Sequence, residues 1–139
     1  MANVIEKPRH PTENWQATLD EWLSDIHSIV EQATKWAVAR GWSTKVDTKT
    51  ITEDVIGTYE APRLLIHAPE ARFLLDPIAK CVVGAEGRID FCVIPSYDAV
   101  PLVKTVGGWR FLSAGSDEAE LTWSDESFGK LCAELTAMQ

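Results

Sequence analysis

Apolar residues recur every three or four positions between Glu13 and Arg40, which is the spacing of one helix face. The stripe consists of Trp15, Leu19, Trp22, Leu23, Ile26, Ile29, Val30, Ala33, Trp36 and Ala37. Arg40 suits the negatively polarised carboxyl end of a helix, and Gly41 suits the residue just beyond it. The pattern therefore predicts one long amphipathic helix over residues 13–40.

From Trp42 to Ala114 the apolar period changes to two, as in half-buried strands. Turn residues interrupt it at Pro69–Glu70, Gly84–Gly87, Pro95–Asp98 and Gly107–Gly108, and residues 53–59 fit a short strand or a turn. Gly107–Gly108 is a two-residue hairpin signal. Pro101 indicates an edge strand or a bulge. Because RFLL and FCVI are apolar on both faces, we expect a strongly curved sheet or one covered by a partner chain.

The helical period returns near the C-terminus, after an acidic loop over residues 115–126. Ser124 is the predicted N-cap of a helix over Asp125–Ala137, and the first helical turn is acidic. The apolar stripe of this helix comprises Phe128, Leu131, Cys132, Leu135 and Met138. Gly129 within it costs about 1 kcal/mol relative to alanine. The predicted fold class is α+β: a long N-terminal helix, an antiparallel β-meander of five to seven strands and a C-terminal helix.

The chain has the length of one domain, because its 139 residues can form a single core and contain no internal repeat or interdomain linker. Residues 1–12 contain Pro8 and Pro11 and few apolar groups, so they are predicted to form a loose N-terminal arm. Residues 13–139 are predicted to form one α+β domain.

The formal net charge of −8 favours some partners over others. Phosphate backbones and anionic lipids attract basic surfaces, so neither a nucleic acid nor a membrane is expected as a partner. A basic protein fits an acidic surface through complementary charge. The six tryptophans are a large number for this length, and tryptophan is enriched both in cores and at binding surfaces.

The three cysteines, Cys81, Cys92 and Cys132, are odd in number and include no C-x-x-C spacing. They are therefore predicted to be free thiols, which suits a reducing compartment. The sequence also shows no apolar signal core and no run long enough to span a bilayer. These features favour a cytoplasmic location.

No motif with recognisable chemistry is present. His10, His27 and His67 have no metal-binding spacing, although His67 has Glu60, Glu70 and Asp76 near it in the sequence. Ser96 and Cys92 lie in no nucleophile motif, and the glycine pairs do not precede a helix as a phosphate loop would. We expect no cofactor, no metal and no catalytic residue, although the sequence leaves enzyme activity open.

Two groups of residues are candidates for a binding surface. Arg88 and Asp90 share one face of a predicted strand, and Tyr97 and Asp98 lie in the turn that follows it. The acidic loop adds Asp117, Glu118 and Glu120.

Three functions are compatible with these features. The favoured one is a non-catalytic protein-binding module: an adaptor, a chaperone-like accessory or a small acidic protein that neutralises a toxin. The second is a small-ligand-binding or enzyme domain with a pocket between sheet and helices. The third is a structural subunit of a larger assembly, for which a homo-oligomer is one form. A cleft with convergent polar groups would favour the second function, and a flat apolar patch the others.

Overall fold

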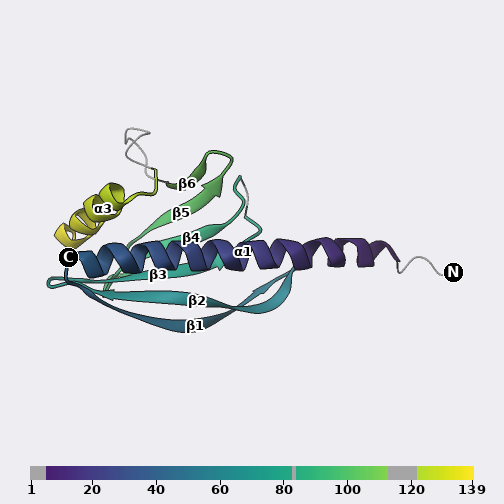
Figure 1. Cartoon of the computed structure of the whole chain (residues 1–139), viewed down its shortest axis with the longest axis horizontal. Helices are drawn as coiled ribbons and strands as arrows, with labels where there is room; N and C mark the ends of the chain where they lie inside the picture. The colour runs from purple at the N-terminus through teal and green to yellow at the C-terminus, as the bar shows by residue number, and fades with distance from the viewer. Residues whose placement is uncertain (1–5, 83, 113–121) are drawn as a thin grey trace.

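The computed structural model describes residues 6–82, 84–112 and 122–139, with side chains described from Trp15 onward. In chain order, the elements are α1 (Glu6–Ala39), β1 (Ser43–Glu53), β2 (Gly57–His67), β3 (Arg72–Ala79), β4 (Arg88–Ile94), β5 (Ala99–Thr105), β6 (Gly108–Phe111) and α3 (Asp125–Ala137) (Figure 1). The strands form one sheet in the order β1-β2-β3-β4-β5-β6, and each neighbouring pair is antiparallel. The predicted α+β class and β-meander are confirmed.

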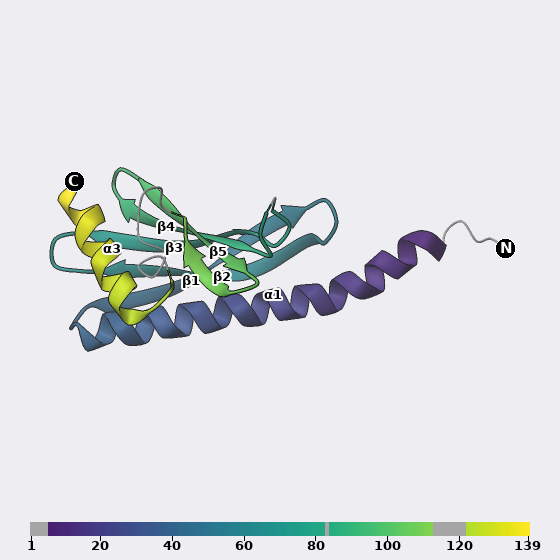
Figure 2. The same cartoon turned by 90° about the horizontal axis from the view of Figure 1, so that it is seen from above.

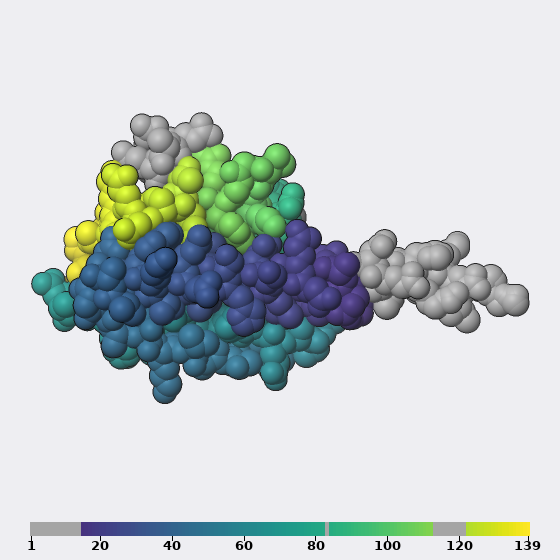
Figure 3. Space-filling view, in the orientation of Figure 1, coloured from purple at the N-terminus to yellow at the C-terminus, as the bar shows by residue number. Residues whose placement is uncertain are grey.

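The two helices lie on the same side of the sheet. Figure 2 shows α1 running along one face of the sheet, and Figure 3 shows α3 lying against the C-terminal half of α1. Phe128 anchors α3, because its ring lies 5.6 Å from that of Trp36 in α1 and 5.7 Å from that of Phe91 in β4, measured between centroids. One aromatic cluster therefore joins both helices to the sheet.

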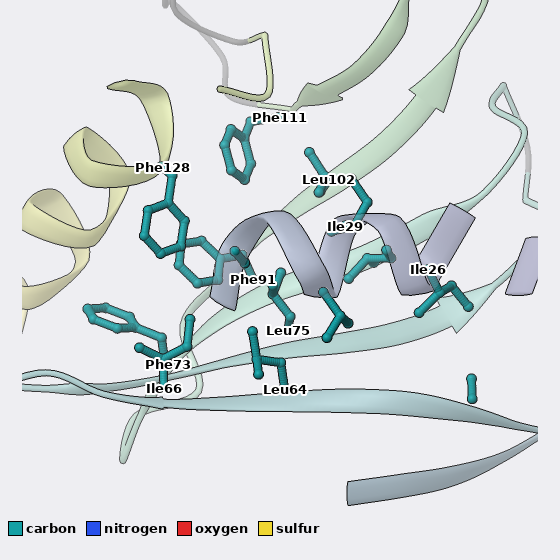
Figure 4. Close-up of a cluster of buried hydrophobic side chains, with 14 of the residues drawn as sticks. Ile26, Ile29, Leu64, Ile66, Phe73, Leu75, Phe91, Leu102, Phe111 and Phe128 are labelled. Carbon is teal, nitrogen blue, oxygen red and sulfur yellow. The ribbon is translucent and has the colours of Figure 1, made fainter. Parts of the chain in front are cut away.

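The core lies between α1 and the sheet face beneath it, as the helical stripe predicts. Trp22, Ile26, Ala33 and Ala37 of α1 are fully buried. Figure 4 shows their neighbour Ile29, with Ile26, directed toward sheet side chains that include Leu64, Ile66, Phe73, Leu75, Phe91 and Leu102. In α3, Phe128, Cys132 and Leu135 are buried, whereas Met138 is 63% exposed because it is the C-cap of the helix.

The first helix begins earlier than the sequence pattern predicts. It starts at Glu6, so residues 6–12 are helical where the sequence pattern predicts an arm, while residues 1–5 lie outside the described part of the chain. Pro8 falls in the first helical turn, where backbone N–H groups have no intrahelical acceptor, and its missing N–H therefore costs no hydrogen bond.

Pro101 does not mark an edge strand. β5 pairs with both β4 and β6, so β1 and β6 are the edges of the sheet. The last pair between β5 and β6 is Leu102 with Phe111, and Pro101 lies just beyond it, where its carbonyl accepts the N–H of Leu112 at 2.9 Å. The proline is tolerated in an interior strand because the partner strand ends there.

The final hairpin turn lies one residue earlier than the glycine pair predicts. Thr105 pairs with Gly108, so the two turn residues are Val106 and Gly107. Gly108 begins β6 with φ of +110°, a conformation that disfavours other residues. The hairpin itself is confirmed.

A chain of hydrogen bonds joins the β1–β2 hairpin to α1 and to the segment after β3. The Trp22 Nε1–H donates to the Tyr59 hydroxyl at 2.9 Å, and this hydroxyl donates to Glu53 at 2.5 Å. The Glu53 carboxylate also accepts the backbone N–H groups of Lys80 and Cys81, both at 2.9 Å. These bonds satisfy polar groups that burial would otherwise penalise.

Candidate functional site

Arg88 and Asp90 form an ion pair on the sheet face turned away from α1. The Arg88 Nε and Nη2 atoms donate to the two oxygens of Asp90 at 2.7 and 3.1 Å. Asp90 lies directly opposite Asp76 of β3, and Lys49 of β1 donates to Asp76 at 2.8 Å. Each carboxylate of the opposed pair thus has its own cation, which offsets their repulsion. The pairing gives Arg88 and Asp90 a structural role.

The same face contains buried apolar residues. Leu74, Cys92 and Val103 are 9%, 7% and 5% exposed, although their side chains point away from α1. Lys49 reaches across from β1 to Asp76 and to the carbonyl of Pro77 on β3. Lys49 thus extends over β2 on this face of the sheet, between β1 and β3.

Tyr97 and Asp98 lie in the β4–β5 turn, at the other end of β4 from Arg88. Tyr97 is 60% exposed and has φ of +64°. The turn is held by the bond from the Val93 N–H to the Asp98 carbonyl, and the Ser96 hydroxyl donates to the Asp98 carboxylate. The four predicted strand and turn residues therefore do not form one site. Asp117, Glu118 and Glu120 lie outside the described residues.

An open pocket lies at the end of the sheet where the β2–β3 connection meets α3. Its volume is about 520 Å³. We call it the end pocket; it is lined by Arg40, Trp42, Ala68, Pro69, Glu70, Phe73, Gly129, Cys132, Ala133, Thr136 and Ala137. Arg72 pairs with Ile94, so the turn that carries Tyr97 extends from the same end of the sheet. The pocket thus brings together three regions that are distant in sequence.

Arg40 occupies the rim of the end pocket and is held there by α3. Its Nη1 donates to the Asp125 carboxylate at 2.7 Å and to the Trp36 carbonyl at 3.0 Å, and its Nη2 donates to the Asp125 carbonyl at 3.2 Å. The guanidinium carbon lies 5.3 Å from the centroid of the Phe128 ring. A Cβ atom on Gly129 would lie 2.5 Å from Nη2, so glycine at this helical position gives the guanidinium its space.

Two polar side chains of the end pocket, those of Arg40 and Thr136, are bonded within the chain. Thr136 Oγ1 donates to the Cys132 carbonyl at 2.7 Å, and Arg40 is engaged as described above. Burial raises the pKa of the Cys132 thiol to about 12, so this sulfur is protonated and a poor nucleophile at neutral pH. The accessible lining is therefore mainly the apolar surface of Trp42, Pro69 and the alanines.

The other two thiols also have raised pKa values. Burial raises the pKa of Cys92 to about 11, with a smaller contribution from the Asp90 charge. Burial and the Glu53 carboxylate raise the pKa of Cys81. Among the described side chains, from Trp15 onward, no three histidine, cysteine or carboxylate groups gather as a metal site would require.

The sequence did not predict the end pocket, because its residues follow no local motif. Gly129 in the α3 pattern was a local signal that another group packs closely there. An interior helical glycine lowers helix stability, and it is often present because a neighbouring side chain needs the space. The sequence shows the glycine but not its neighbour Arg40, which lies 89 residues away in the chain.

Comparisons with known proteins gave no additional information on the fold or the site. No protein-family model matches the chain, and no curated protein or solved structure was found to be similar to it. The described parts of α1 and α3 contain no stretch that is both long and apolar enough to cross a membrane. What the chain defines is thus an α+β domain with a helix-covered meander and an open apolar pocket at one end.

Proposed function

We propose that this protein is a non-catalytic binding module, and that the end pocket receives an apolar side chain of a basic protein partner. An adaptor, a chaperone-like accessory or a toxin-neutralising protein would each work in this way. The observation that carries the proposal is the open apolar pocket, in which the Arg40 and Thr136 side chains are already bonded within the chain.

The shape of the pocket supports a protein partner. Protein interfaces depend on a few buried anchor side chains that fill pockets and are surrounded by a polar rim. Trp42 supplies an aromatic wall, and Glu70, exposed on the β2–β3 connection, supplies a charged rim. Tyr97 projects from the same end of the sheet, and tyrosine is enriched at interfaces. These residues together suit an apolar anchor beside a basic group.

The charge of the chain supports a basic partner. The net charge is −8, while the ion pairs on the outer sheet face balance one another. Complementary charge accelerates encounter and discourages wrong partners, so a basic surface is the one favoured here.

A small apolar ligand is the second candidate. The pocket volume of about 520 Å³ lies in the range of small-molecule sites, which is the observation in its favour. The opening of the pocket to solvent favours the protein partner, because small-molecule sites bury most of their ligand's surface. A cytoplasmic location also belongs to the proposal, and the three free cysteines support it.

The experiment identifies the partner and then blocks the pocket. The full chain serves as bait for affinity capture from the native host, and the captured protein is then purified for surface plasmon resonance. Ala133→Trp places an indole in the pocket, whereas Glu134→Trp adds the same group to the next residue of α3, which does not line the pocket. We expect Ala133→Trp to weaken binding about tenfold or more, equivalent to about 1.4 kcal/mol.

The control decides the interpretation. Equal affinities for Ala133→Trp, Glu134→Trp and the unmodified chain would contradict the pocket as the anchor site. A small molecule that remains bound in native mass spectrometry of the unmodified chain, and is lost in Ala133→Trp, would replace the protein partner with the second candidate.

A further inference from the structure

The two edges of the sheet differ in how they are protected. β6 has four residues, and its outer side is partly paired, because Arg110 forms a bridge with Thr122 and the Trp123 N–H donates to the Trp109 carbonyl. β1 has eleven residues, and among the described residues it pairs only with β2. Figure 1 shows β1 as the outermost strand, with no other labelled element beyond it.

β1 lacks most of the features that keep an edge strand from pairing. Proteins protect edges with short strands, prolines, bulges or charged side chains. β1 is long, contains no proline, and pairs with β2 in a continuous register from Ser43 to Glu53 without a bulge. Val46 is 53% exposed on it. Four threonines, a valine and an isoleucine make its sequence a strong strand former.

The charged residues of β1 favour one register of pairing with a second β1 strand and disfavour another. In an antiparallel pair of two β1 strands centred on Thr48, all eleven residues overlap, and Asp47 of each copy lies opposite Lys49 of the other. Asp47 is bonded to Arg63 and Lys49 to Asp76 within each chain, so the strand pair would set these two ion pairs side by side with opposite charges facing. Centring on Asp47 would instead place Asp47 opposite itself and Lys45 opposite Lys49. Opposite charges across strands stabilise a pair and like charges destabilise it. The register with the greatest overlap is therefore also one with matched charges.

We propose that two copies of this chain associate through the outer edges of their β1 strands, antiparallel about a two-fold axis at Thr48, so that their sheets continue into one. The backbone N–H and C=O groups along the outer side of β1 then gain partners. Thr50 of one copy covers the exposed Val46 of the other. The contact is isologous, so it closes at two copies and leaves no free β1 edge for further growth. This dimer does not depend on the proposed function, because the end pocket contains no residue of β1.

The first measurement is sedimentation velocity of the full chain over a wide concentration range. We expect a species of twice the 15.4 kDa mass of the chain, in equilibrium with the monomer. A monomer at every concentration would overturn the proposal.

The second measurement maps the register by cysteine cross-linking, in a Cys81→Ser background because Cys81 is the exposed thiol. Thr48→Cys places the two sulfurs opposite each other at the two-fold axis, where neighbouring strands bring Cα atoms within disulfide range. Thr50→Cys is the matched control, because residue 50 lies opposite residue 46 and far from its own copy. We expect mild oxidation to give a covalent dimer with Thr48→Cys alone.

A dimer that cross-links equally through Thr50→Cys, or through neither residue, would mean that another surface or register is used and would overturn the proposal. Circular dichroism checks that both variants fold.

Discussion

At the scale of single residues, Glu53 joins the β1–β2 hairpin to the segment after β3, since its carboxylate accepts bonds from Tyr59, Lys80 and Cys81. Burial alone would raise the pKa of this carboxyl, but the N–H groups of Lys80 and Cys81 and the Tyr59 hydroxyl outweigh burial and hold the pKa below its usual value. Burial raises the pKa of Tyr59, and its hydrogen bond to the Glu53 carboxylate raises it further, so this hydroxyl remains a donor at neutral pH. The charged form of Glu53 is therefore the one that the fold stabilises.

Replacing Glu53 should change how stability depends on pH. A carboxyl whose pKa is lowered by folding contributes stability above its unfolded pKa of about 4.3 and loses it as the pH falls through the folded value. We expect Glu53→Gln to lower the free energy of unfolding at pH 7 and to flatten its decline in acid. Urea denaturation from pH 7 to pH 3 measures this, with Glu60→Gln, on an exposed residue of β2, as the control. Parallel curves for the two variants would refute the role of Glu53.

At the scale of elements, the contact between Arg40 and Gly129 couples the end of α1 to α3. Alanine in a helix interior is usually more stable than glycine by about 1 kcal/mol. Here the added methyl group would displace the Arg40 guanidinium, which is bonded to Asp125. The usual preference for alanine is thus opposed by the loss of the contact between the helices.

A double-mutant cycle should reveal this coupling. We expect Gly129→Ala to bring little or no gain in the unmodified chain, because the displaced Arg40 loses its bonds to Asp125. In an Arg40→Ala background the same change should stabilise by about 1 kcal/mol, since nothing then opposes the propensity gain. Chemical denaturation of the four proteins measures both steps. An equal gain in the two backgrounds would show that the guanidinium moves without cost.

The sequence predicted the elements where the apolar period alone decides them. α3 runs from Asp125 to Ala137 as predicted, and Ser124 is its N-cap, with reciprocal bonds to Ser127. The structure differs from the sequence pattern at two prolines. Pro8 lies within α1, and Pro101 lies in an interior strand. The sequence alone does not show whether the backbone at a proline would have needed an N–H donor. The end pocket could not be predicted, since its residues meet only after three elements have packed.

At the scale of the whole molecule, charge should act on the rate of association more than on the lifetime of a complex. The net charge of −8 sets a long-range field, which salt screens within about 8 Å at physiological ionic strength. The end pocket, by contrast, should act on dissociation, because buried anchors determine how long partners stay together.

Neutralising the acidic loop tests this division. We expect the combined change Asp117→Asn, Glu118→Gln and Glu120→Gln to slow association with the captured partner and to weaken its dependence on salt. The loop precedes α3 and lies outside both predicted apolar stripes, so the thermal unfolding midpoint should stay close to that of the unmodified chain. Surface plasmon resonance at several salt concentrations measures the rates. An association rate indifferent to salt and to the triple change would remove the argument from charge.

The meander order of the strands has a consequence for how the chain folds as it is synthesised. Every strand after β1 pairs with the strand made just before it, so each hairpin closes a short loop at low entropic cost as soon as its second strand emerges. α1 is in a different position, because its apolar stripe packs against β1 and β2, and Trp22 also stacks on Trp109 of β6. The stripe must wait until those strands have left the ribosome. The helix that is synthesised first is therefore among the last elements to be buried.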